Sequence, residues 1–87
     1  MNYILLPIAL TFASPVLAHH PVHVSTNAYR THVIDPPSNI REYANGPIIC
    51  SANKRSEIWL GWERNGWFPT RYCNGQLGWI HHTQVSL

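Results

Sequence analysis

The C-terminal third of the chain contains two Asn-Gly pairs, Asn65-Gly66 and Asn74-Gly75, each lying between segments rich in tryptophan and other apolar residues. Asn-Gly is the strongest short-range indication of a tight β-hairpin, because both central residues of a type I′ turn need a positive φ. Two such turns close together predict a meander of three short strands. A chain with this pattern is expected to fold as a small β domain.

Further segments with strand character precede the two turns, and no window supports an amphipathic helix of useful length. In the segment 57–63, Ile58, Leu60 and Trp62 are expected on one face of a strand and Trp59 on the other. Gly61 lies inside this segment, which indicates a bulge or a close backbone approach. The predicted strands are 32–35, 48–52, 57–63, 67–73 and 76–81, with a short extended segment at 38–41 and a brief helical turn near 83–85. The predicted fold class is all-β, with about five short antiparallel strands.

Residues 1–18 have the composition of a secretory signal peptide. The run 4–17 is almost wholly apolar and uncharged, and it ends in Val16-Leu17-Ala18, a small-residue pattern typical of a cleavage site. A bilayer span needs roughly 20 apolar residues, and Pro7 and Pro15 interrupt this shorter run. We expect cleavage after Ala18 and a periplasmic or secreted protein without stable membrane insertion. No Lys or Arg precedes the run, so an uncleaved membrane anchor and a buried N-terminal strand are the alternatives.

The chain has two cysteines, Cys50 and Cys73. In an exported protein an even number of cysteines suggests a disulfide, and two cysteines allow one pairing. A domain this small has a core that supplies only a few kcal/mol of net stability, so a covalent cross-link would matter. Closing the loop between these two positions would stabilise the fold by about 3 kcal/mol in the chain-entropy model. Neither cysteine belongs to a C-x-x-C pair, which disfavours zinc, and a pair of free buried thiols is the alternative.

The formal net charge is +2, and the basic residues are scattered rather than gathered into a stripe, so nothing favours a nucleic-acid partner. Residues 19–31 are polar and rich in histidine, and they are expected to form a flexible N-terminal arm. Histidines behind a free amino terminus can hold copper or zinc, so His19, His20 and His23 permit a metal-handling protein as an alternative. His81 and His82 would point to opposite faces of a regular strand. No metal site and no cofactor is therefore assigned.

Several short elements follow one another in an order that resembles the bacterial Src homology 3 domain family. The elements are Asn39-Ile40-Arg41, Gly46-Pro47, the strand 57–62, Gly66-Trp67, Asn74-Gly75 and Gly78-Trp79-Ile80. The resemblance extends over approximately residues 33–85 and implies a small, partly open barrel formed by residues 32–87. It also implies a domain without catalytic machinery that binds cell-wall peptides or other proteins.

The chain departs from the family at two places. The segment 41–47 is longer than the family's usual Arg-Ser-Gly-Pro stretch, so ligand contacts from this loop do not carry over directly. The cysteine pair is not a general family feature, and it would suit an exported variant in which Cys50 on one strand is joined to Cys73 at the second hairpin.

The domain has more large aromatic side chains than a barrel of this size can bury, so some of them are expected on the surface. By strand alternation, Trp67 and Trp79 are predicted to face the core, whereas Trp59, Phe68 and Tyr72 are predicted to face outward. Outward-facing aromatic residues beside polar groups are typical of shallow peptide-binding grooves. The candidate ligand-binding residues are Tyr43, Trp59, Phe68 and Tyr72.

Enzymatic chemistry is not indicated. Nucleophilic hydrolysis needs an activated Ser or Cys beside a base, and glycosidase chemistry needs two facing carboxylates. No spacing pairs the four acidic residues, and no catalytic residue is assigned. We expect a non-catalytic binding module for a peptidoglycan peptide or an envelope protein. The alternatives are the metal-handling protein described above and a structural or inhibitory protein that docks through a sheet edge.

Overall fold

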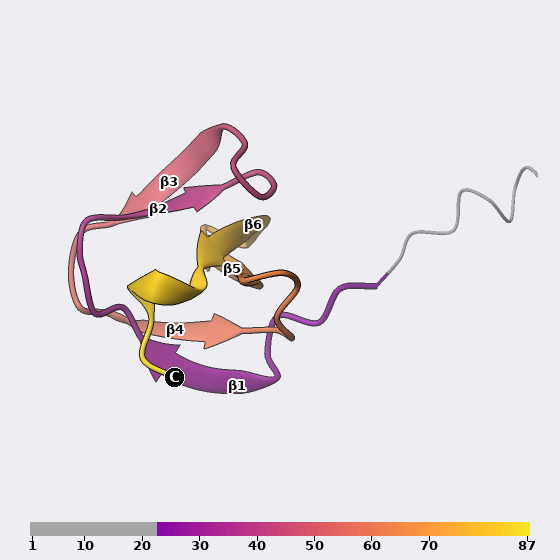
Figure 1. The fold of residues 1–87 in the computed structure, drawn as a ribbon, viewed down its shortest axis with the longest axis horizontal. Coiled ribbons are helices and arrows are strands. Elements are labelled where there is room, and N and C mark those ends of the chain that lie inside the picture. The colour runs from indigo at the N-terminus through magenta and orange to yellow at the C-terminus, as the bar shows by residue number, and fades with distance from the viewer. Residues whose placement is uncertain (1–22) are drawn as a thin grey trace, which may run out of the picture.

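The computed structural model describes residues 23–87, and this part of the chain is mostly β-structure (Figure 1). The signal peptide predicted for residues 1–18 lies outside the described residues. The elements are β1 (Tyr29–His32), β2 (Ser38–Arg41), β3 (Ile48–Ala52), β4 (Glu57–Leu60), β5 (Trp67–Cys73), β6 (Gln76–His81) and the short 3₁₀-helix η1 (His82–Gln84). The helical turn predicted at the C-terminus is confirmed, one residue earlier than expected.

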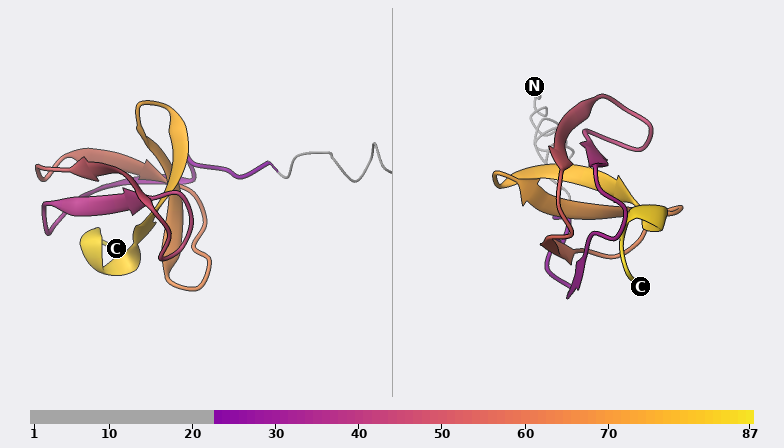
Figure 2. Two further views of the ribbon diagram at one scale, coloured as in Figure 1. Left: turned by 90° about the horizontal axis from the view of Figure 1, so that it is seen from above. Right: turned by 90° about the vertical axis from the view of Figure 1, so that its left-hand side faces the viewer.

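The strands form two antiparallel sheets that do not close on each other. One sheet pairs β1 with β4, and the other has the strand order β3-β2-β6-β5. The β5–β6 hairpin lies between the β2–β3 hairpin and the β1–β4 pair, as Figure 1 and the right-hand view of Figure 2 show. The predicted class, a small all-β and partly open barrel, is confirmed, with six strands rather than about five.

Both Asn-Gly turns have the predicted conformation. Asn65 and Gly66 have φ values of 50° and 90°, and Asn74 and Gly75 have 55° and 85°. Positive φ at both central positions is the requirement of a type I′ turn. The second turn joins β5 to β6, and the first is closed by two hydrogen bonds between the backbones of Arg64 and Trp67, 2.8 and 3.0 Å long.

The predicted three-stranded meander is nevertheless wrong, because β4 pairs with β1 instead of β5. β4 ends at Leu60, three residues before the expected end, and Trp62 is 68% exposed rather than aligned with Ile58 and Leu60. Beyond the strand, the Gly61 N–H donates to the Pro69 carbonyl over 2.8 Å. The chain thus leaves the β1–β4 sheet before it turns at Asn65.

The first strand lies earlier than predicted. β1 spans Tyr29–His32, so the segment 29–31 belongs to a sheet rather than to a flexible arm, and only His32 of the predicted strand 32–35 lies in a strand. Tyr29 and Thr31 are partly buried, whereas Arg30 and His32 are exposed. Because this strand buries Tyr and Thr instead of aliphatic side chains, it carries a weak hydropathy signal.

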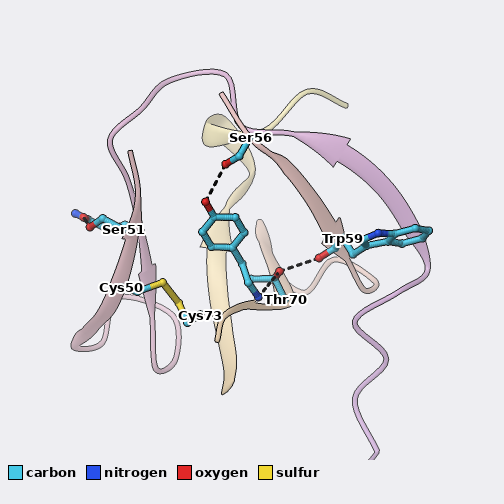
Figure 3. Close-up of a disulfide and its surroundings, with 8 residues drawn as sticks. Cys50, Ser51, Ser56, Trp59, Thr70 and Cys73 are labelled. Atoms are coloured by element: carbon cyan, nitrogen blue, oxygen red, sulfur yellow. Dashed lines mark hydrogen bonds between the residues drawn. A yellow bond between two sulfur atoms is a disulfide. The ribbon is translucent and has the colours of Figure 1, made fainter. Parts of the chain in front are cut away.

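The core lies between the two sheets, and all its members are less than a tenth exposed. They are Val33, Ile40, Ala52, Ile58, Leu60, Phe68, Cys73, Ile80 and Val85. The predicted disulfide between Cys50 and Cys73 is present, with the Cα atoms 5.8 Å apart (Figure 3). It joins β3 to β5, which are the two outermost strands of the four-stranded sheet. A covalent bond thus connects the two edges that hydrogen bonds leave apart.

Candidate functional site

The outer face of the four-stranded sheet carries two tryptophans, an arginine and a histidine. Trp67 pairs with His81 across β5 and β6, and Arg41 on β2 pairs with Trp79 on β6. Paired residues point to the same side of a sheet, and so do residues two apart on one strand. The side chains of Arg41, Trp67, Trp79 and His81 therefore share the face opposite the core.

Two depressions lie on this side of the molecule, and Trp67 lines both of them. The first has a volume of about 310 Å³ and is lined by Pro37, Asn39, Arg41, Asn45, Trp67, His81 and Gln84. The second has a volume of about 250 Å³ and is lined by Tyr43, Ala44, Arg64, Asn65, Trp67 and Trp79. We call the two depressions together with Trp67 between them the Trp67 face.

The aromatic rings of the Trp67 face are held by polar neighbours. The Trp67 ring meets the His81 ring edge-on, with centroids 4.9 Å apart. The Arg64 guanidinium lies 5.9 Å from the centroid of the Trp79 ring, within the range of a cation–π interaction. Both tryptophans are half-buried, so part of each ring is covered and part can contact a ligand.

The loop between β2 and β3 forms one wall of this face. Its turn is closed by a hydrogen bond of 2.8 Å from the Gly46 N–H to the Tyr43 carbonyl, and Asn45 has a φ of 59°. A Cβ on Gly46 would lie 2.6 Å from the Tyr43 ring, so only glycine allows this ring to cover the turn. The Arg41 Nη1 donates to the Gly46 carbonyl over 2.8 Å. The loop that departs from the family pattern is thus tied to the sheet, with Tyr43 beside the second depression.

Two of the four predicted ligand-binding residues lie elsewhere, in a third depression. It has a volume of about 270 Å³, and its lining includes Trp59 and Tyr72 together with Glu57 and Arg71. Trp59 is 48% exposed and points outward, as predicted (Figure 3). Tyr72 is partly buried, and its hydroxyl lies 2.9 Å from Ser56 Oγ. The structure therefore brings Trp59 and Tyr72 together but leaves Tyr43 on the Trp67 face.

The predicted outward orientation of Phe68 is wrong. Phe68 is 2% exposed and packs in the core against Tyr29, with ring centroids 5.9 Å apart. Conversely, Trp67 and Trp79 were expected in the core and lie on the outer face instead. The core face of β6 is occupied by Gly78 and Ile80, both buried. Assigning Ile80 to the core would have placed Trp79 outside, since neighbouring strand residues point to opposite faces.

Sequence patterns also missed the polar members of the Trp67 face. Arg41, Arg64 and His81 come from β2, the first Asn-Gly turn and the end of β6, and no local motif links them. All three pair with a tryptophan of the two Gly-Trp elements. Arg41 pairs with Trp79, and Arg64 and His81 both pair with Trp67.

The two adjacent histidines do not point to opposite faces, contrary to expectation. The His81 and His82 ring centroids are 4.4 Å apart, because β6 ends at His81 and the chain bends into η1 at His82. The His81 Nδ1 lies 2.8 Å from Thr83 Oγ1. Across residues 23–87 no three His, Cys, Asp or Glu side chains gather as a metal-binding group, and His19 and His20 lie outside this range.

The chemistry available on the Trp67 face is therefore stacking, hydrogen bonding and ion pairing.

In the part of the chain from residue 23 onward, no helix has the length and apolar character needed to cross a membrane. Comparisons with protein-family models, with curated proteins and with solved structures found no match to this chain.

Proposed function

We propose that the protein is an exported, non-catalytic binding module of the bacterial Src homology 3 type, and that its Trp67 face holds a peptide strand of the cell wall. The observation that carries the proposal is the position of Trp67, which lines two neighbouring depressions. A ligand that fills both must pass over the indole ring, and extended peptides are the ligands that aromatic-lined grooves of small barrels accept.

The energetic argument concerns Trp67 itself. Partly covered tryptophans flanked by arginine are typical of the few residues that supply most of an interface's binding free energy. The Trp67 ring is fixed by His81, so little conformational entropy is lost when a ligand stacks on it. Trp67 is therefore the residue whose removal should weaken binding most.

Export is supported by the disulfide between Cys50 and Cys73. Structural disulfides persist in oxidising compartments and are rare in the cytosol. This agrees with the secretory signal expected in residues 1–18, and we propose a periplasmic or secreted location on both grounds.

Binding to purified peptidoglycan tests the proposal. Trp67→Ala should raise the apparent Kd, measured by depletion of protein from solution, about tenfold or more, as expected for the loss of a central aromatic anchor. Trp62→Ala is the matched control, because Trp62 is the most exposed tryptophan and lines none of the three depressions. Its apparent Kd should equal that of the parent. Circular dichroism in the near ultraviolet establishes that both variants keep the fold.

Two results would redirect the proposal. If Trp59→Ala weakens binding and Trp67→Ala does not, the ligand occupies the depression lined by Trp59 and Tyr72. If the parent does not bind peptidoglycan at all, the cell-wall ligand is wrong and an envelope protein becomes the candidate partner, to be sought by affinity purification.

A further inference from the structure

We infer that the ligand of the Trp67 face is an acidic peptide, whose carboxylates are bound by Arg41 on one side of Trp67 and by Arg64 on the other. The inference rests on the proposed function and specifies the chemistry of its ligand. It is carried by the distribution of charge around Trp67.

Each of the two depressions contains one arginine and no acidic residue. Arg41 lines the first and Arg64 lines the second. The chain has four acidic residues, Asp35, Glu42, Glu57 and Glu63, and none of them lines either depression. A ligand with carboxylates therefore meets an arginine and no acidic lining residue in each depression, which favours both its selection and its association rate.

The Arg41 guanidinium is already oriented for such a contact. One of its N–H groups donates to the Gly46 carbonyl over 2.8 Å. A guanidinium has five N–H donors arranged as a rigid fork, so further donors remain for a carboxylate. Because the hydrogen bond to Gly46 restricts the side chain, less entropy is lost when a ligand binds.

Arg64 is held differently but serves the same purpose. It is exposed beside the Asn65-Gly66 turn, and its guanidinium lies 5.9 Å from the centroid of the Trp79 ring. An arginine over an aromatic face keeps the edge of its guanidinium available for a bidentate pair with a carboxylate. Trp67 lines both depressions, so a segment that joins carboxylates bound in the two must contact this aromatic ring.

The third depression differs in its charges. It contains Glu57 beside Arg71, and Glu57 forms an ion pair of 3.3 Å with Arg30. An acidic ligand gains less there because a carboxylate is already present. The acidic peptide is therefore assigned to the Trp67 face alone.

The test compares native peptidoglycan with peptidoglycan whose carboxyl groups have been coupled to methylamine by a carbodiimide. The parent should bind the capped material about tenfold more weakly, which is the effect expected for losing charge-assisted hydrogen bonds. Arg64→Gln should weaken binding to native material about tenfold, and capping should weaken this variant less than the parent. Arg55→Gln is the matched control, because it removes the same charge from an exposed turn that lines neither depression.

The outcomes separate the two proposals. Equal binding of the parent to native and capped material would overturn the acidic ligand and leave the peptidoglycan-binding function standing. Equal losses in Arg64→Gln and Arg55→Gln would mean that the effect comes from net charge, and would also overturn the inference. If the parent binds neither material, the proposed function and the inference fall together.

Discussion

Among the described residues 23–87, Tyr29 is the titratable side chain whose pKa its surroundings shift most clearly. It packs on the buried Phe68 and lies 6.3 Å from the Trp62 ring, measured between centroids. Burial raises the pKa of the Tyr29 hydroxyl above its ordinary value of about 10, and the nearby Glu63 carboxylate raises it further. Both causes disfavour the ionised phenolate in the folded protein, so the stability of the fold depends on keeping Tyr29 neutral.

We expect the free energy of unfolding to fall as the pH rises above about 10, the value at which an unfolded tyrosine ionises. Above that pH the unfolded chain has released the Tyr29 proton while the folded chain still holds it, so each further rise in pH lowers the free energy of unfolding. Tyr29→Phe should make the decline shallower in urea unfolding between pH 9 and pH 11. Tyr43→Phe, at a residue that is 58% exposed, is the control for the loss of a tyrosine hydroxyl as such. Identical slopes for the parent and Tyr29→Phe would contradict this account.

Individual strands and turns differ in how far the sequence predicts them. The Asn-Gly turns were predictable, because positive φ at both central residues is a local requirement that few other residues meet. The pairing of β4 with β1 was not, since partner choice depends on contacts between residues far apart in the chain. The predicted orientations of Phe68 and Trp79 were wrong for a related reason. A shift of one residue moves every side chain of a strand to the other face, and the turns alone do not determine which face becomes core.

At Gly61 the sequence correctly indicated that another part of the backbone approaches closely. An added Cβ there would overlap the Ser25 carbonyl oxygen, so the expected close backbone approach is confirmed. The segment before β1 passes over the end of β4 at this point. One hydrogen bond, 2.9 Å from the Ala28 N–H to the Leu60 carbonyl, continues the contact into the sheet.

Gly61→Ala should therefore displace the segment before β1. We expect the Ala28 amide to exchange its hydrogen roughly tenfold faster, because the bond to Leu60 would open locally without global unfolding. Gly75→Ala is the control, because its Cβ would enter open space while its φ of 85° strains the turn. That variant should lose about 1 kcal/mol of overall stability without selective exchange at Ala28. Unchanged exchange in Gly61→Ala would mean that the segment can shift without loosening.

The molecule as a whole combines a small core with one covalent link. Hydrogen bonding ends at β3 on one side of the larger sheet and at β5 on the other, and the disulfide joins these two strands. The sequence predicted the cysteine pairing from the expected export and from the small size of the core. That the bond connects the sheet's two outer strands could not be predicted, because it depends on the β2–β6 pairing between the hairpins.

Replacing both cysteines with alanine should lower the free energy of unfolding by about 3 kcal/mol, the value expected for opening a loop of this length. Urea unfolding followed by tryptophan fluorescence measures the change. The parent treated with a reductant should unfold at the same urea concentration as the double variant. A loss below about 1 kcal/mol would show that the cross-link adds little to the packed sheets.

The pairing of β2 with β6 rests on a single residue pair, Arg41 with Trp79, and this junction lies directly beneath the Trp67 face. The sulfur bridge connects the same two hairpins through their other strands, β3 and β5. The disulfide therefore keeps the two hairpins joined across the interface with the fewest register pairs in the larger sheet. A force that a ligand on the Trp67 face exerts between the two hairpins is thus resisted by a covalent bond as well as by the packed core.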